Sequence, residues 1–279
     1  FVGIADDAEI EFRLAALDPN GNCTNGIDRI ASSETYVGDD GSKLNYWNRA
    51  RYLNIWVTKV IGSGAAAYAY LPGGAPSAST DGIICRSDYV GSIGSGNALT
   101  SRTLTHEIGH FLNLPHVWGF SNTPGVTCGN DGVTDTPVTK GWTSCNLTTN
   151  DVCNNNVVEN VQNYMEYSFC EHMFTNGQRA RMWTALGSGT GQRNSLWTTA
   201  THTATGILNP QPCAPIADFG PSDQQFVCAG GNLTFTDYSF NAQATSYSWS
   251  FGGGTPSTST DSVPNVVYNT PGTYSVSLT

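Results

Sequence analysis

The segment that most constrains the fold is HEIGHFLNLPHVWG, residues 106–119. His106 and His110 are four residues apart, and residues at that spacing share one face of a helix. His116 follows six residues later, which on a continued helix would place it about 9 Å further along the axis. A chain that brings the three imidazoles together must therefore end its helix after His110 and turn back.

Two residues between the second and third histidines favour this turn. Asparagine is, after glycine, the residue that best tolerates the left-handed backbone at a helix end, and position 113 is Asn113. Pro115 then prevents the helix from resuming. A catalytic zinc ion takes three protein ligands, such as three imidazoles, and leaves its fourth position open for water. The sequence therefore predicts a zinc site, and we interpret the other two histidines, His172 and His202, as surface or core residues.

The first 208 residues have the pattern of a mixed α/β (α+β) domain. Alternating apolar residues predict strands in residues 9–15, 51–61 and 81–91, with Ile10, Phe12 and Leu14 on the buried face of the first. In the second segment, Leu53, Ile55 and Val57 form the apolar set. Helices are predicted around the histidines and in residues 176–187, where Gly187 ends the second helix.

A proline-rich linker, residues 207–219, separates this part from a second domain at 209–279. Short alternating segments between Gly, Pro and Ser turns predict a β-sandwich there. Its predicted core is apolar and mostly aromatic: Leu233, Phe235, Trp249, Phe251, Tyr274, Val276 and Leu278. A sandwich needs a further strand after Thr279, so we expect the native chain to continue.

Charge and cysteine content narrow the class of protein. The net charge is −10 and only 12% of residues are charged, which argues against a nucleic-acid partner. No apolar run is long enough to span a membrane. The first residues read as folded protein, so we expect that any targeting or pro-segment has been removed or left out. Eight cysteines without a C-x-x-C pair favour disulfides, and hence a secreted, extracellular protein.

The histidine segment resembles the metzincin metallopeptidase motif, with Glu107 after the first histidine. NYMEYS, residues 163–168, is similar to the methionine turn of metzincins and contains Met165. Together with FRLAALDPNGN, YLNIWV, DGVTDTP and FTNGQRARM, it resembles the pappalysin group, including its ulilysin-like members, over residues 10–207. The resemblance implies a metzincin-like catalytic domain with a twisted mixed sheet and an active-site helix. PIADF, SYSWSFGGGTPSTST and PGTYSVSLT resemble a PKD-type immunoglobulin-like domain.

The resemblance implies a secreted zinc endopeptidase that acts on proteins or peptides and is made as a zymogen. Glu107 would be the general base, Tyr167 would stabilise the tetrahedral intermediate, and Met165 would lie beneath the metal without binding it. A calcium ion is also implied in the long loop after the histidines. Its candidate ligands are oxygen-bearing residues: Asp131, Val133 by its carbonyl, Asp135 and Thr136.

Disulfide pairing is also carried over from the resemblance, because spacing alone leaves several connectivities open. The implied pairs are Cys128–Cys153, Cys145–Cys170, Cys213–Cys228 and Cys23–Cys85.

The chain departs from the ulilysin-like pattern after the methionine turn. Ser168 and Phe169 precede Cys170 where acidic residues are expected, so we predict a broad or hydrophobic substrate preference instead of a basic one. Two alternatives stay open: a non-catalytic secreted binding or adhesion protein, and a zinc amidase acting on a cell-wall peptide. The PKD-like domain could bind substrate, contact a glycan or surface, or act as a spacer.

Overall fold

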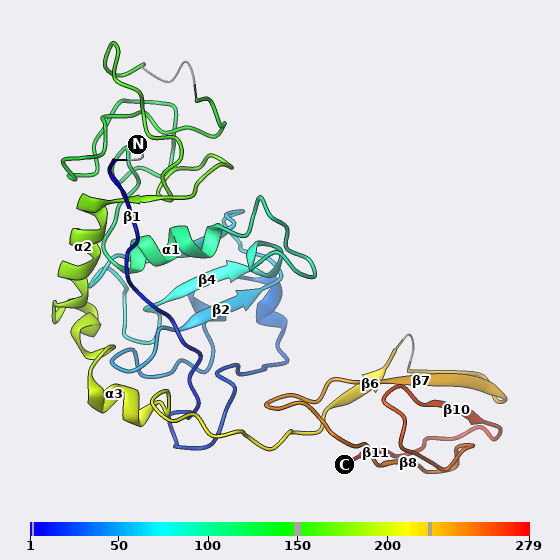
Figure 1. Ribbon diagram of the computed structural model, residues 1–279. Helices are drawn as coiled ribbons and strands as arrows, with labels where there is room; N and C mark the ends of the chain where they lie inside the picture. Colours follow the sequence, from blue (N-terminus) through cyan, green and yellow to red (C-terminus); the bar gives the residue numbers. More distant parts are fainter. Residues whose placement is uncertain (2, 148–151, 223–224) are drawn as a thin grey trace. The chain divides into compact units, whose positions relative to one another are not determined.

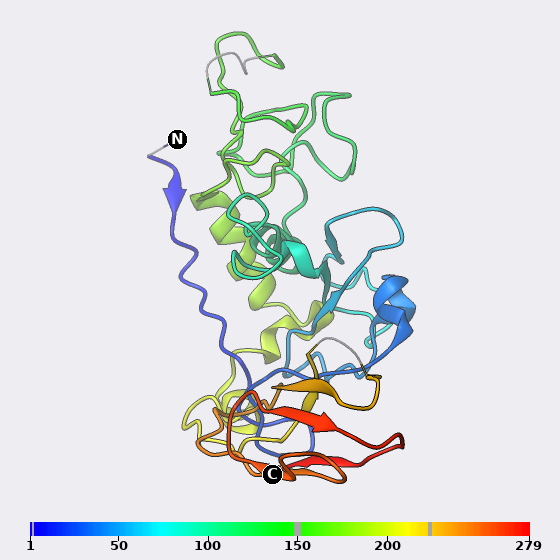
Figure 2. The same ribbon diagram turned by 90° about the vertical axis from the view of Figure 1, so that its right-hand side faces the viewer.

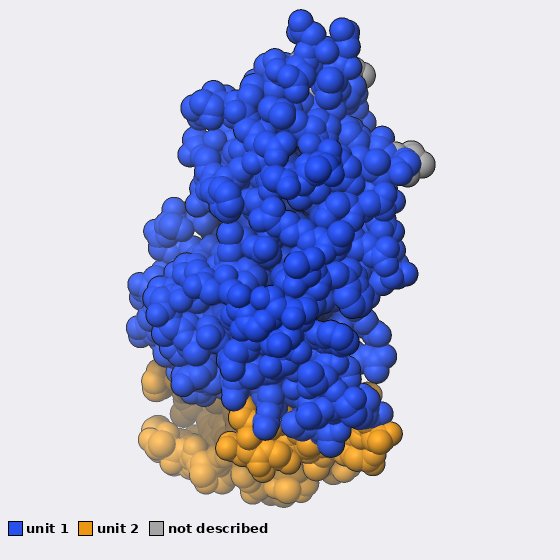
Figure 3. All heavy atoms as spheres, turned by 90° about the vertical axis from the view of Figure 1, so that its left-hand side faces the viewer, with its two compact units in different colours: residues 1–13, 28–208 blue, residues 14–27, 209–279 orange. Residues whose placement is uncertain are grey.

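The structure is a computed structural model that describes residues 1, 3–147, 152–222 and 225–279. Its contacts divide the chain into two compact units, which Figure 3 colours separately. Unit 1 comprises Phe1–Arg13 and Asp28–Leu208, and unit 2 comprises Leu14–Ile27 and Asn209–Thr279. The division differs from the predicted domain ranges because Leu14–Ile27 groups with unit 2. Within that unit, the Asn25 N–H donates to Asn241 Oδ1 at 2.7 Å.

Unit 1 is built on a mixed three-stranded sheet, as the sequence predicts (Figure 1). Its order is β2 (Ile55–Thr58), β4 (Ile83–Arg86) and β3 (Ala67–Ala69). Strand β2 runs parallel to β4, and β3 runs antiparallel to it. The first three residues of β4 are fully buried, because β4 is the central strand and helix α1 (Thr103–Phe111) packs against it and β3.

Two strand predictions need correction. Residues 9–15 form no strand, and Phe12 and Leu14 are 50% and 68% exposed; the nearby strand β1 is Ala5–Asp6, which pairs with β5 (Phe174–Thr175). Strand β2 is shorter than predicted and presents its other face inward. Thr58 is buried and Trp56 is half-buried, while Ile55 and Val57 are exposed. The Trp56 indole donates to the Leu44 carbonyl at 2.7 Å, so this aromatic side chain takes the inner face.

Helix α2 (Asn176–Leu186) begins at a capping box, close to its predicted start. Thr175 Oγ1 accepts from the Gln178 N–H at 3.1 Å, and Gln178 Oε1 accepts from the Thr175 N–H at 3.0 Å. Shorter helical segments complete unit 1: η1 (Ser33–Tyr36), η2 (Asp40–Ser42), η3 (Ser87–Tyr89), η4 (Thr190–Ser195) and α3 (Thr199–Ala204). Figures 1 and 2 both show the N-terminal segment that contains β1 running beside α2.

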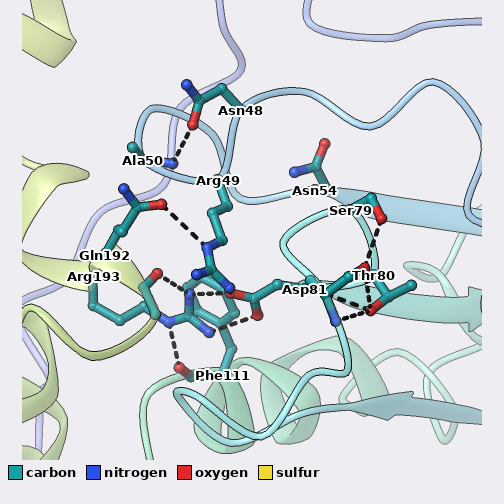
Figure 4. Close-up of polar contacts among 12 residues, drawn as sticks. Asn48, Arg49, Ala50, Asn54, Ser79, Thr80, Asp81, Phe111, Gln192 and Arg193 are labelled. Carbon is teal, nitrogen blue, oxygen red and sulfur yellow. Dashed lines mark hydrogen bonds and ion pairs between the residues drawn. The ribbon is translucent and has the colours of Figure 1, made fainter.

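A buried ion pair fastens the end of α1 to the rest of unit 1 (Figure 4). The Arg193 guanidinium donates to both carboxylate oxygens of Asp81 at 2.8 Å, and neither side chain is more than 1% exposed. Arg193 Nε also donates to the Phe111 carbonyl at 3.0 Å, and the guanidinium lies 3.5 Å from the Phe111 ring centroid. One side chain therefore joins η4, the segment before β4 and the last residue of α1.

Unit 2 contains the predicted sandwich, made of two antiparallel three-stranded sheets. One sheet has the order β10 (Asn265–Tyr268), β7 (Gly231–Asp237), β6 (Phe219–Pro221), and the other β11 (Val276–Leu278), β8 (Trp249–Phe251), β9 (Thr258–Ser259). The core consists of the predicted Phe235, Trp249 and Phe251 with Val266 and Tyr268. The remaining predicted core residues, Leu233, Tyr274, Val276 and Leu278, are half-buried against it.

The cysteines in the described part of the chain form three disulfides, two of which are pairs that the resemblance implies: Cys128–Cys153 and Cys145–Cys170. The third joins Cys23 to Cys213, so the predicted pairs Cys23–Cys85 and Cys213–Cys228 are wrong. Cys85 lies in the central strand with its side chain fully buried beneath α1, where a surface cysteine cannot reach it. Cys228 is an exposed free thiol in unit 2.

Candidate metal centre

The turn after α1 has the geometry that the sequence predicts. Asn113 has φ = 76°, in the left-handed region. Its N–H donates to the His110 carbonyl at 2.9 Å, and the Leu114 N–H donates to the Gly109 carbonyl at 2.9 Å. These two bonds form a Schellman motif, which ends the helix and reverses the chain. His116 is thereby returned toward the helix face that carries the first two histidines.

The three imidazoles converge. One ligand atom from each of His106, His110 and His116 lies within 4.8 Å of the others. Every Nδ1 lies close to a backbone carbonyl: His106 to Tyr164 O at 2.6 Å, His110 to Leu114 O at 2.7 Å, and His116 to Ser121 O at 2.9 Å. Because a carbonyl oxygen can only accept, each Nδ1 carries the hydrogen and each Nε2 keeps its lone pair.

This arrangement fits a bound metal ion. The Nε2 atoms of His110 and His116 are 3.2 Å apart, so two lone pairs face each other. Two imidazole ligands of a tetrahedral zinc ion are separated by about 3.3 Å, given the usual Zn–N bond length. Burial lowers the pKa of His106 well below its usual range and that of His116 to about 3, so these rings are neutral at pH 7. Neutral rings whose lone pairs converge form a suitable site for a cation.

Glu107 supplies a carboxylate beside the imidazoles. Its side chain is buried, and Oε2 has no hydrogen-bond partner among the described residues. Burial raises the pKa of Glu107 to about 8, against a backbone hydrogen bond from Ala69 of β3 that lowers it. A buried carboxyl group with a free oxygen can accept and release a proton near neutral pH.

Met165 is completely buried and lies against Gly109 of α1. A Cβ built on Gly109 would overlap its sulfur, so Gly109 lets the methionine turn approach the helix. The sequence analysis did not single out Gly109, although a glycine inside a helix is a signal of close approach.

Two aromatic side chains complete the centre. The Tyr167 ring centroid lies 5.5 Å from that of His106 and 4.9 Å from that of His116, and the side chain is partly exposed. Burial, and then the charge of Glu107, raise the pKa of Tyr167 to about 12, so its hydroxyl keeps its proton. Trp118, which the sequence analysis did not identify, stacks on His116 with ring centroids 4.5 Å apart. The sequence signal that could have identified Trp118 is its place as an aromatic residue two positions after His116.

The predicted calcium ligands are only partly brought together. Asp131 Oδ1 accepts from the Val133 N–H at 3.0 Å and from Thr136 Oγ1 at 2.5 Å, and Thr136 Oγ1 lies 2.8 Å from the Val133 carbonyl oxygen. We call this segment, residues 131–136, the Asp131 turn. The Asp135 carboxylate instead accepts from Thr175 Oγ1 at 2.7 Å and the Gly177 N–H at 2.8 Å, at the start of α2.

Comparisons with known proteins agree with this geometry. The family model described as "Pregnancy-associated plasma protein-A", a peptidase family, matches residues 21–187, and a PKD domain model matches residues 217–279. Proteins named extracellular metalloprotease from Arthroderma otae and Trichophyton verrucosum are both 34% identical to the chain, over 191 and 193 residues. The matches cover 64% and 65% of this chain, which spans 66% of the length of each relative.

Solved structures of one peptidase are also similar. Mature mirolysin of Tannerella forsythia, in complex with a cleaved peptide, is 35% identical with a TM-score of 0.65, covering 74% of this chain and 80% of that one. A promirolysin mutant from the same organism is 33% identical with a TM-score of 0.64, covering 74% and 71%. Within the described residues, no helix combines the length and apolar character needed to cross a membrane.

Proposed function

Because the chain belongs to the pregnancy-associated plasma protein-A family, the pappalysins, we propose that it is a secreted zinc endopeptidase that hydrolyses peptide bonds in proteins. The observation that carries this proposal is the convergence of three neutral imidazoles beside the unpartnered carboxylate oxygen of Glu107. Three histidine ligands leave a fourth position open for water, the arrangement of catalytic zinc sites.

The residues of the chain divide the chemistry among them. When bound, zinc supplies a polarised carbonyl and a water of lowered pKa. Glu107 takes the proton of the attacking water at its free carboxylate oxygen and delivers it to the leaving amine nitrogen. Tyr167, whose hydroxyl stays protonated, donates a hydrogen bond to the oxyanion that develops on the substrate.

We also propose a calcium ion at the Asp131 turn, held by the Asp131 carboxylate, the Val133 carbonyl and Thr136. Carboxylate, carbonyl and hydroxyl oxygens are the ligands that calcium prefers, and those of this turn lie within hydrogen-bond distance of one another. Asp135 is left out of the set, because the start of α2 satisfies its carboxylate. Calcium should raise the melting temperature, and Asp131→Asn should abolish this effect while exposed Asp7→Asn should not.

Secretion and substrate preference belong to the same proposal. The disulfides and the relatives named extracellular metalloproteases support an oxidising, extracellular location. Phe169 is 61% exposed and is not preceded by an acidic residue, which supports a preference for apolar side chains after the scissile bond.

The test is cleavage of a proteome-derived peptide library, read by mass spectrometry. The untreated protein should cut, while Glu107→Ala and a chelator-treated sample should not. Glu11→Ala is the matched control, because Glu11 is an exposed carboxylate that forms a surface ion pair with Arg13. Zinc-loaded, folded protein that cuts no peptide would overturn the proposal and favour the binding-protein or amidase alternatives. Dominant cleavage before Arg or Lys would contradict the apolar preference.

A further inference from the structure

One face of α2 contacts two segments that orient the histidines: the methionine turn and the turn after α1. Gln178 and Arg181 are three residues apart and therefore neighbours on the helix surface. We propose that these two side chains are positioning residues, which hold the histidines in ligating geometry and join the metal centre to the Asp131 turn. The inference rests on the metal site proposed above and goes beyond it by assigning residues that touch neither metal nor substrate.

Gln178 acts on the first histidine through the methionine turn. Its amide forms two hydrogen bonds with the Asn163 amide: Asn163 Nδ2 donates to Gln178 Oε1 at 2.8 Å, and Gln178 Nε2 donates to Asn163 Oδ1 at 3.0 Å. Both side chains are fully buried. A paired buried amide is held in one orientation, because any rotation would leave polar atoms without partners.

The fixed Asn163 amide in turn fixes the main chain beneath the metal. Asn163 Oδ1 accepts from the Met165 N–H at 2.9 Å. The residue between them, Tyr164, provides the carbonyl that accepts from His106 Nδ1 at 2.6 Å. Gln178 therefore determines the position of the carbonyl that orients the first imidazole.

Arg181 acts on the other two histidines through the turn after α1. Its Nε donates to the Asn113 carbonyl at 2.7 Å, and its Nη1 donates to the Asp131 carbonyl at 2.8 Å. Asn113 is the left-handed residue that reverses the chain, and the next carbonyl, of Leu114, accepts from His110 Nδ1. The rigid fork of the guanidinium thus fixes this turn against a second loop.

Both side chains also reach the Asp131 turn. Gln178 Nε2 lies 3.5 Å from Asp131 Oδ2, while Arg181 binds the carbonyl of the same residue. A displacement of Asp131 would therefore be transmitted both to the methionine turn, through Gln178, and to the turn after α1, through Arg181.

Arg181→Ala is the first test, and Arg179→Ala is its matched control. Arg179 lies on the same helix and is half-buried, but its guanidinium pairs with Asp6 and Glu9 near the start of the chain. For Arg181→Ala we expect zinc to bind about tenfold more weakly, the lower end for partners that orient metal ligands. At saturating zinc, kcat should fall while KM changes less than twofold, and the visible absorption of the cobalt-substituted protein should shift.

Two further variants test Arg181 and Gln178 separately. Arg181→Lys keeps the charge but offers a single donor point, so its zinc affinity should lie between those of the native protein and Arg181→Ala. Gln178→Ala should weaken zinc binding in the same direction through His106; should it not fold, the two Arg181 variants decide. If Arg181→Ala matches Arg179→Ala in zinc affinity and cobalt spectrum, the positioning role is refuted. If the native protein itself binds no zinc, the proposed function fails instead.

Discussion

The indole ring of Trp118 lies parallel to the imidazole of His116, with an interplanar angle of 2° and ring centroids 4.5 Å apart. The two side chains also share one acceptor: Trp118 Nε1 and His116 Nδ1 both donate to the Ser121 carbonyl, at 2.8 and 2.9 Å. The third ligand of the predicted metal centre is thus held by a ring face and by a hydrogen bond whose acceptor the same tryptophan fixes.

Trp118→Phe should therefore weaken zinc binding. The substitution keeps an aromatic face but removes one hydrogen bond to Ser121 O, worth about 1 kcal/mol, or roughly fivefold in affinity. Competition with a coloured zinc chelator measures the change. Trp183→Phe is the control, because it loses a comparable bond, from the Trp183 indole N–H to the Ala8 carbonyl at 2.9 Å. An equal loss of affinity in both variants would contradict the role of Trp118.

Gly109→Ala should destabilise unit 1, because the new Cβ would overlap the buried Met165 sulfur. Overpacking of this kind costs about 1–3 kcal/mol in the free energy of unfolding. Gly187→Ala is the control at the end of α2, where a Cβ would make ordinary contacts at 3.6 Å and φ is −80°. Urea unfolding should show the control to be neutral or more stable than the native protein, and the reverse order would contradict the packing argument.

Asp81→Ala should lower the free energy of unfolding far more than Asp88→Ala, which removes an exposed carboxylate. It leaves the fully buried Arg193 guanidinium without its carboxylate, which costs about 3–5 kcal/mol in the free energy of unfolding. Asp88 pairs with Arg86, but both side chains are about one third exposed, so Asp88→Ala should cost about 1 kcal/mol or less. Thermal unfolding of the two variants distinguishes these values. Similar losses of stability would show that the buried Asp81–Arg193 pair does not stabilise unit 1 as we infer.

In the metal-free protein, the three ligand histidines should lower the free energy of unfolding as the pH falls below about 6.5, while the raised pKa of buried Glu107 acts in the opposite direction. Burial depresses the pKa of all three ligand histidines in the folded state, to about 3 for His116, so the unfolded chain binds protons first. The stabilisation is complete above the unfolded pKa and is lost as the pH falls toward the folded value. Urea unfolding at pH 7.5 and pH 5 measures the difference. His116→Gln should shift this difference in favour of pH 5, His202→Gln should not, and an unchanged difference in His116→Gln would refute the assignment.

The parts of the structure that could be predicted from sequence depend on local geometry. Asn113 and Pro115 lie within the segment whose path they determine, and the helix spacing of His106 and His110 needs no distant information. The capping box of α2 is likewise contained in four residues, and the sandwich core follows from alternation along each strand.

The failures involve distant partners. The apolar alternation of residues 9–15 suggested burial, but no strand pairs with them and Phe12 stays exposed. The assignment of Cys85 to a disulfide was wrong because its strand is the central one in the sheet, which the sequence alone does not reveal. The hydrogen-bond donors of the Asp135 carboxylate, Thr175 and Gly177, lie 40 and 42 residues further along the chain, so the sequence could not place Asp135 against the start of α2.

The three carbonyls that orient the imidazoles belong to Tyr164, Leu114 and Ser121, and all three are main-chain atoms. Every amino acid provides such a carbonyl, so mutation at these positions cannot delete the acceptor. The orientation of the ligands is thereby protected from sequence drift as long as the backbone path is kept. A lineage descended from this protein could exchange many of the side chains around the metal centre without rebuilding the orientation of its ligands.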